Sequence, residues 1–319
     1  MRPPVKATLT RLSALLLLGL ATPTARAADV VVVKSKTITA YNDAVTAFNL
    51  ACKASIKEFD MEGKDERGDK IIEIINGNPP SLVFAVGAQA AEKVRKSVDS
   101  KIPFIFSMVS GAKEEEFKTA NSTGISMIIP PQQLLAAVKA IVPGTTKVGV
   151  AYNPKNSQAI IDQAAKSGES LGVQLIAAKV ASKEDTPRAI RSSFSAGIDA
   201  LWLISDPTVA TEEGFKTMLD YSLSSKVPFI AYAEAFVQNG ALASLAVNPE
   251  NLGVQAGHLA NRIISGEKID SLPVEPPQKL NLSINLDTAK TIGRQCDTAL
   301  AIFTYAARND FAIKVYGGQ

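Results

Sequence analysis

The stretch KVGVAYNPKNSQ, Lys147–Gln158, begins with alternating apolar residues and ends in small polar ones. Its alternation from Val148 to Tyr152 predicts a strand, and the Asn153-Pro154 break predicts a turn into a helix with Asn156 or Ser157 as N-cap. The first N–H groups of a helix have no partner within it, so they face whatever lies above the strand end. Open α/β sheets bind ligands at this edge. The stretch therefore predicts half of a ligand site.

Strand-like apolar runs alternate with helical patterns along the whole chain. The runs are Val30–Val33, Ser55–Phe59, Leu82–Val86, Phe104–Phe106 and Gly124–Met127, then Val148–Tyr152, Gln174–Ala178, Ala200–Ile204, Phe229–Tyr232, Ala241–Val247 and Leu280–Leu286. Such alternation predicts α/β lobes with parallel sheets and right-handed crossovers. Two successive series predict two sheets, one per lobe. The segments Ser126–Pro131, Gly240–Leu245 and Pro276–Leu282 are the expected connections between the lobes.

The first 27 residues have the pattern of a secretory signal peptide. A basic start precedes the apolar run Leu12–Ala21, and Ala25-Arg26-Ala27 fits a small-x-small cleavage site. The uncharged run is shorter than the roughly 20 residues of a membrane span. The leader holds four of the 34 basic residues and no acidic one, so the mature chain carries 30 basic against 31 acidic residues, or −1. We expect an exported, soluble, periplasmic protein with no nucleic-acid surface.

Enzyme signatures are scarce in this sequence. The one histidine, His258, lies off the apolar stripe of its predicted helix, and there are only two cysteines, Cys52 and Cys296. These residues cannot assemble a zinc cluster. The sequence contains no G-x-S-x-G elbow, no G-x-G-x-x-G and no phosphate-binding G-x-x-x-x-G-K-[ST] motif. We therefore expect a non-enzyme with no catalytic residue, metal or cofactor; the sequence leaves open whether the two cysteines form a disulfide.

Polar residues instead gather where the predicted strands end. The first series contributes Lys34 to Lys36, Gly87 to Gln89 and Ser107 to Gly111, and the second contributes Asn153 to Gln158, Ser205 to Thr208 and Glu234. A single polar loop is weak evidence of function, because loops are polar for solubility. Repetition at the carboxyl ends of strands in two lobes predicts a cleft that surrounds a small molecule.

The order of several motifs resembles the substrate-binding proteins of bacterial ABC transporters, in the branch that includes tryptophan and phenylalanine binders. The motifs are VFAVG (Val83–Gly87), KIPFIFSMV (Lys101–Val109), VGVAYNPKNSQ (Val148–Gln158), ALWLISDPTV (Ala200–Val209), AYAEAFVQNGALASL (Ala231–Leu245) and LGVQAG (Leu252–Gly257). The resemblance implies a type I periplasmic-binding-protein fold, with two Rossmann-like lobes joined by a three-strand hinge. We expect lobe 1 at 28–126 plus 244–279, lobe 2 at 127–243 plus 280–294, and a C-terminal extension at 295–319.

The resemblance also implies a function and a set of residues. A monomer would capture a small organic ligand between the lobes and deliver it to an ABC permease and ATPase. The expected ligand-binding residues are Ser35, Tyr41, Gly87, Ala88, Gln89, Ser107, Val109, Ser110, Asn153, Asn156, Ser157, Asp206, Glu234 and Phe236. The helix start near Ser157 would hold a carboxylate, Asp206 or Glu234 an amino group, and an aromatic side chain such as Tyr41 or Phe236 would stack on a ring.

The sequence departs from the family pattern at one position, and it leaves two alternative functions open. Amino-acid-binding relatives tend to carry an acidic residue in the loop after the fourth strand, where this chain has Gly111. A carboxylated or neutral organic solute is therefore as compatible with the sequence as an aromatic amino acid. The protein could also present its ligand to a membrane sensor, or be an exported enzyme.

Overall fold

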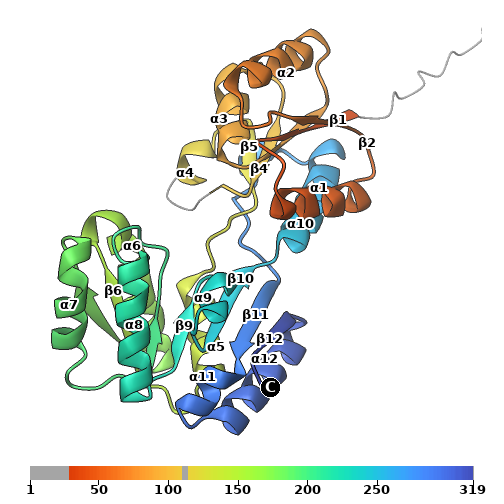
Figure 1. The fold of residues 1–319 in the computed structure, drawn as a ribbon. Coiled ribbons are helices and arrows are strands. Elements are labelled where there is room, and N and C mark those ends of the chain that lie inside the picture. Colours follow the sequence, from red (N-terminus) through yellow and green to blue (C-terminus); the bar gives the residue numbers. More distant parts are fainter. Residues whose placement is uncertain (1–28, 110–113, 319) are drawn as a thin grey trace, which may run out of the picture.

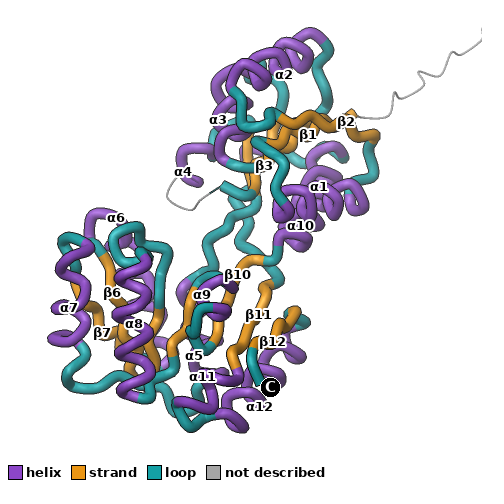
Figure 2. The backbone as a smooth tube through the Cα atoms, in the orientation of Figure 1, coloured by secondary structure: helices purple, strands orange, loops and turns teal. Residues whose placement is uncertain are grey.

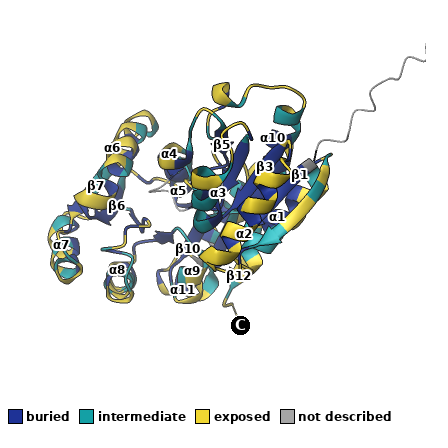
Figure 3. Cartoon of the chain, turned by 90° about the horizontal axis from the view of Figure 1, so that it is seen from above, coloured by how far each residue is buried: buried dark blue, intermediate teal, exposed yellow. Residues whose placement is uncertain are grey.

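The computed structural model describes residues 29–109 and 114–318, and the expected signal peptide lies outside this part of the chain. Two α/β lobes, each built on one sheet, are joined by three connections (Figure 1). Both sheets are mostly parallel, as the alternation of strands and helices predicts. Figure 3 shows the buried strands lying between helices whose outer faces are exposed.

Lobe 1 has five parallel strands in the order β2-β1-β3-β4-β5. Its elements are β1 (Asp29–Lys34), α1 (Thr39–Ala51), β2 (Ser55–Asp60), α2 (Asp65–Gly77), β3 (Leu82–Val86), α3 (Ala88–Ser97), β4 (Phe104–Ser107), α4 (Glu114–Phe117), β5 (Ser122–Gly124), α10 (Pro249–Ile264) and η3 (Ile269–Ser271). Helices cover both faces of the sheet, so the valines of β1 are buried on either side. This explains why β1 is apolar at every position from Val30 to Val33.

Lobe 2 has seven strands in the order β12-β11-β10-β9-β8-β6-β7. Its elements are α5 (Pro131–Ile141), β6 (Lys147–Tyr152), α6 (Pro154–Leu171), β7 (Gln174–Lys179), η2 (Lys183–Asp185), α7 (Thr186–Ser193), β8 (Ala200–Trp202), α8 (Glu212–Ser225), β9 (Phe229–Ala231), α9 (Glu234–Gln238), β10 (Ala243–Val247), β11 (Leu280–Asn285), α11 (Leu286–Thr291), α12 (Gln295–Asn309) and β12 (Ala312–Tyr316). β11 is antiparallel to β10, and β12 is parallel to β11.

The topology changes two of the expected boundaries. β10 belongs to the sheet of lobe 2, so the chain enters lobe 1 after Val247 and not at Ser244. The expected connection Gly240–Leu245 is therefore wrong, because most of it lies in or beside β10. Residues 295–319, expected as an extension, supply α12 and β12 within the described range, and Ile302 and Ala306 are buried in the core of lobe 2.

Three connections link the lobes (Figure 2). The first, residues 125–130, runs from β5 to α5; the second is Asn248, between β10 and α10; the third, residues 272–279, runs from η3 to β11. The first and third lie side by side, because Ile125 forms a parallel bridge with Glu275. In the part of the chain that the structure describes, no helix has the length and apolar character that a membrane crossing requires.

Candidate functional site

The strand directions place the two candidate half-sites on facing edges. β5 is parallel to β4, and its carboxyl end leads directly into the first connection. β10 is parallel to β9, and its carboxyl end leads directly into the second connection. In each lobe, therefore, the carboxyl edge of the parallel strands is the edge from which the chain leaves for the other lobe. Ligands of open α/β sheets bind at this edge.

The edge of lobe 1 brings Ser35, Tyr41 and Gly87 together. The Ser35 hydroxyl donates to the Val86 carbonyl at 3.0 Å and accepts from the Ala90 N–H at 2.9 Å. Gly87 has φ +90°, and a Cβ there would lie 2.6 Å from Tyr41 Oη and 2.7 Å from Ser35 Oγ. Position 87 therefore requires glycine both for its backbone conformation and for the space that the two side chains occupy.

Helix α3 begins at this point with part of its N-terminus available. Ser35 satisfies the N–H of Ala90, but the N–H groups of Ala88 and Gln89 have no partner among the described residues. The Tyr41 hydroxyl likewise has no partner there, and burial raises its pKa. The Gln89 amide instead donates to Asp65 Oδ1 at 2.8 Å, at the start of α2.

Ser107 is the last residue of β4, and Met108 and Val109 follow it at the carboxyl edge of lobe 1. The Ser107 carbonyl accepts from the Gly87 N–H at 2.9 Å, and its hydroxyl donates to the Ile125 carbonyl at 3.3 Å. Met108 has φ +60°, which is unusual for a residue with a side chain. Val109 is 1% exposed and packs in the core with α2 and α3, so its side chain is not open to a ligand. Ser110 lies outside the described residues.

In lobe 2, four of the expected residues form one hydrogen-bonded cluster around Asp206. This carboxylate is fully buried. Its donors are the Asn153 N–H at 2.9 Å, the Ser157 hydroxyl at 2.7 Å, the Thr208 N–H at 2.8 Å and the Asn156 amide at 3.3 Å. Each oxygen accepts two bonds, which fills the roughly four acceptor positions of a carboxylate. Asp206 thus holds the loop after β8 against the start of α6 and has no position left for a ligand ammonium group.

The start of α6 also differs from the expectation, both in its N-cap residue and in the availability of its N–H groups. The N-cap is Asn153, not Asn156 or Ser157, and its side chain accepts from the Lys155 N–H at 3.0 Å. Pro154 has no N–H, and the Asn153 carbonyl accepts from both Asn156 at 2.9 Å and Ser157 at 3.0 Å. No N–H group is left here for a carboxylate, so the α3 start, rather than the α6 start, has the unpaired donors.

Glu234 and Phe236 lie on α9, and both contact other residues of lobe 2. The Glu234 carboxylate forms an ion pair with Lys314 at 2.9 Å and accepts from the Tyr316 hydroxyl, both on β12. Phe236 packs on Phe215, with ring centroids 5.0 Å apart, and on Tyr232, at 5.1 Å. Sequence reasoning missed the partners on β12 because it treated this segment as an extension, although its β-branched and aromatic residues are typical of a strand.

Comparisons with known proteins agree with this architecture. The family model described as ABC transporter substrate binding protein matches residues 49–307. A tyrosine-binding protein from Clostridioides difficile is 26% identical over 222 residues. That alignment covers 67% of this chain and 63% of the relative's length.

Two solved structures show the same fold at low sequence identity. The ligand-free, open structure of CD0873, a substrate binding protein with adhesive properties from Clostridium difficile, matches with a TM-score of 0.72 and 20% identity. The match covers 91% of this chain and all of the other. An ABC domain from Streptococcus pneumonia in complex with L-Trp matches with a TM-score of 0.53 and 21% identity, over 86% of this chain and 98% of the other.

Proposed function

The chain belongs to the ABC transporter substrate-binding protein family, and from this we propose that it captures a small organic solute between its lobes and delivers it to a membrane ABC importer. The observation that carries the proposal is the orientation of the two carboxyl edges toward the connections and toward each other. A ligand that contacts both edges at once has more contacts when the lobes close. Its differential affinity for the closed arrangement would shift the population toward it.

An amino acid is the solute that the residues of lobe 1 support best. The N–H groups of Ala88 and Gln89, at the positive end of α3, would donate hydrogen bonds to a carboxylate, and the Tyr41 hydroxyl would add a donor. On the opposite edge, the Tyr232 ring follows β9 and packs edge-on against Phe236, so it offers an aromatic surface for a ligand side chain. The relatives that bind tyrosine or hold L-Trp support the same class.

Two observations count against an acidic side chain as the acceptor for a ligand ammonium group. Asp206 is occupied by protein donors, and the acidic residue that relatives carry is Gly111 in this sequence, outside the described residues. An ammonium group would therefore find its acceptors elsewhere, among carbonyl and amide oxygens of the lobe 2 edge. We propose export to the periplasm after cleavage near Ala27, and a monomer that delivers its ligand to an importer of ABC permease and ATPase subunits.

Isothermal titration of residues 28–319 with L-tyrosine, L-tryptophan and L-phenylalanine tests this function. At least one should bind, and Gly87→Ala should weaken that binding more than about tenfold, because the new Cβ would displace Tyr41 and Ser35. Gly144→Ala is the matched control, since Gly144 also has positive φ, at +86°, but has open space around it. Absence of binding to amino acids, small acids, nucleosides and sugars at millimolar concentration would contradict the proposal.

A further inference from the structure

A polar stripe on α10 holds the third connection along its length. The stripe consists of Asn251, Gln255 and Arg262, whose spacing of four and seven residues places them on one face of the helix. Asn251 Oδ1 accepts from the Lys279 N–H at 2.9 Å, and Arg262 Nη1 donates to Glu275 at 2.7 Å. The partners occur in the reverse order along the chain, so the third connection runs antiparallel to α10.

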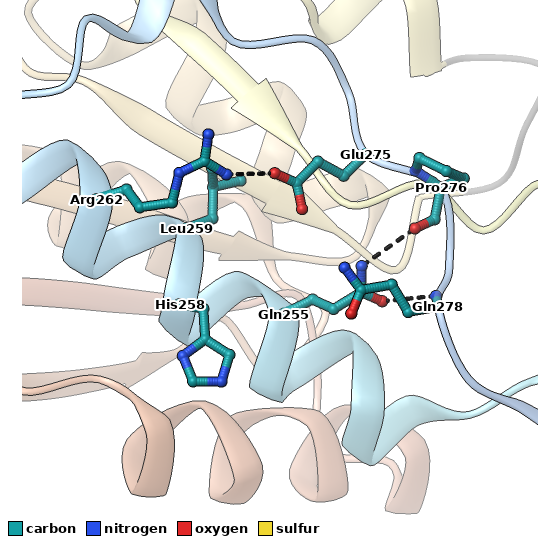
Figure 4. A pocket seen from close by; sticks show the side chains of 7 residues that line it. All are labelled: Gln255, His258, Leu259, Arg262, Glu275, Pro276 and Gln278. Carbon is teal, nitrogen blue, oxygen red and sulfur yellow. Dashed lines mark hydrogen bonds and ion pairs between the residues drawn. The ribbon is translucent and has the colours of Figure 1, made fainter. Parts of the chain in front are cut away.

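Gln255 is the centre of this stripe. The residue is 3% exposed, its Nε2 donates to the Pro276 carbonyl at 3.1 Å, and its Oε1 accepts from the Gln278 N–H at 3.0 Å. Figure 4 shows these bonds beside the Arg262–Glu275 pair, in a pocket of about 300 Å³ that His258 also lines. The Gln255 amide thus binds two backbone groups of the third connection. These bonds hold the backbone itself, which a contact to a side chain of the connection would not do.

The helix that carries the stripe is itself packed tightly into lobe 1. A Cβ at Gly253 would lie 2.0 Å from the Ala44 carbonyl oxygen of α1, and a Cβ at Gly257 would lie 2.7 Å from Ala51 Cβ. The backbones of α1 and α10 therefore approach closely. The third connection as far as Lys279 is consequently held by lobe 1.

The first connection is held by lobe 1 as well. Glu114, on α4, accepts from the Met127 N–H at 2.7 Å and from the Ser126 hydroxyl, and burial raises the pKa of this carboxyl. The Ser126 N–H donates to the Glu275 carbonyl at 2.8 Å. The Ile128 N–H donates to Ser126 Oγ at 2.8 Å. The chain is thus bound to lobe 1 up to Ile128.

We propose that the lobes pivot where the connections enter lobe 2, at 129–130, 247–248 and 279–280, and that the Asn248–Asn281 hydrogen bond restrains this pivot. Asn248 Nδ2 donates to Asn281 Oδ1 at 2.8 Å, from the start of α10 to β11, so the bond crosses the pivot line. Pro130 and Pro131 restrict rotation in the first connection and place more of the motion at the other two. The inference rests on the lobe closure of the proposed function.

Amide hydrogen exchange measures the bound connections directly. In the wild-type protein the N–H groups of Met127, Gln278 and Lys279 should be protected, since each has a side-chain acceptor in lobe 1. Gln255→Leu should speed exchange at Gln278 by at least about fivefold. His258→Ala is the matched control: His258 is exposed on the same helix, lines the same pocket, and its side chain has no hydrogen bond within the described residues. Fast exchange at all three amides in the wild type would overturn the proposal.

Distance measurements between spin labels test the pivot itself. Labels at Glu73 on α2 and Asp220 on α8, in a background with Cys52 and Cys296 replaced by alanine, would report the separation of the lobes. Asn281→Ala should broaden the distance distribution while exchange at Gln278 stays as in the wild type. An unchanged distribution would show that the Asn248–Asn281 bond does not restrain the pivot. Both measurements use the protein without ligand, so a failure to bind amino acids would not be confused with a failure of the hinge.

Discussion

At the residue scale, polar side chains at strand ends join elements of the fold as often as they remain available for a ligand. Ser35 links β1, β3 and α3 through one hydroxyl. Ser157 neither caps α6 nor remains free, because its hydroxyl donates to the buried Asp206. Tyr41 differs, since its hydroxyl has no partner among the described residues. All three side chains carry a hydroxyl group, so only the contacts distinguish a structural polar group from an available one.

Asp206→Asn should destabilise lobe 2. The new NH2 group would face two donors, whichever way the amide is turned, and a buried hydrogen bond to a charged group would be lost. We expect the free energy of unfolding to fall by about 3 kcal/mol, measured by urea denaturation. Asp162→Asn is the control, because Asp162 is exposed and, among the described residues, its carboxylate accepts only from Gln158, at 2.7 Å. Equal effects of the two substitutions would refute the assigned role of Asp206.

The Glu234 carboxylate should stabilise the attachment of β12 in a pH-dependent way. The hydrogen bond from Tyr316 and the ion pair with Lys314 lower its pKa, although burial opposes them. A lowered pKa contributes stability above the unfolded-state value of about 4.3, and this contribution is lost as the pH falls through the folded-state pKa. Glu234→Gln should therefore unfold at lower urea than the wild type at pH 7.

The stabilities of Glu234→Gln and the wild type should converge as the pH falls below the lowered folded-state pKa of Glu234, because the Glu234 side chain is then neutral as well. The control for Glu234→Gln is Glu169→Gln, which changes an exposed carboxylate on α6 for which the structure shows no side-chain partner among its described residues. A stability difference between Glu234→Gln and the wild type that persists at acid pH would exclude ionisation as its origin.

At the element scale, two helices that follow parallel strands differ in what their starts can bind. α6 begins with Asn153 and Pro154, and its early N–H groups are satisfied locally. α3 begins after Gly87, which has no side chain to act as a cap, so two N–H groups remain without a partner in the described chain. A capping side chain that satisfies a helix start also removes it as an anion site.

The α1–α10 contact gives a prediction for a helix pair. Gly253→Ala would place a methyl group against the Ala44 carbonyl, so the helices must move apart. The free energy of unfolding should fall by about 2–3 kcal/mol, as in overpacked cores. Gly77→Ala is the control, because Gly77 is also helical but has nothing within 4 Å of the place that a methyl group would take, and should change stability by less than about 1 kcal/mol. A tolerated Gly253→Ala would mean that this contact is not close.

At the scale of the whole molecule, strand direction links fold and function. Parallel strands place all their carboxyl ends on one edge, and the chain leaves each lobe from that edge. The second crossing occurs at Asn248, immediately after β10, so α10 lies in lobe 1 while β10 belongs to the sheet of lobe 2. Because lobe 1 holds the connections, we expect the lobes to rotate at the points where the connections enter lobe 2 when a ligand binds or leaves.

The sequence by itself determined the α/β class and the two series of strands, and it predicted the carboxyl edges as the place of a ligand site. Hydrophobic periodicity depends on local geometry, which the order of residues contains. The tertiary structure alone decided that β10 and β12 belong to lobe 2, that Asp206 and Glu234 are occupied, and that α3 rather than α6 has unpaired N–H groups. These outcomes depend on which donors and acceptors meet across 49 to 82 residues of chain, as in the Ser157–Asp206 and Glu234–Tyr316 bonds. The spacing of residues along a sequence does not show which donors and acceptors will form hydrogen bonds, because a buried polar group bonds to whichever partner the packing brings close to it.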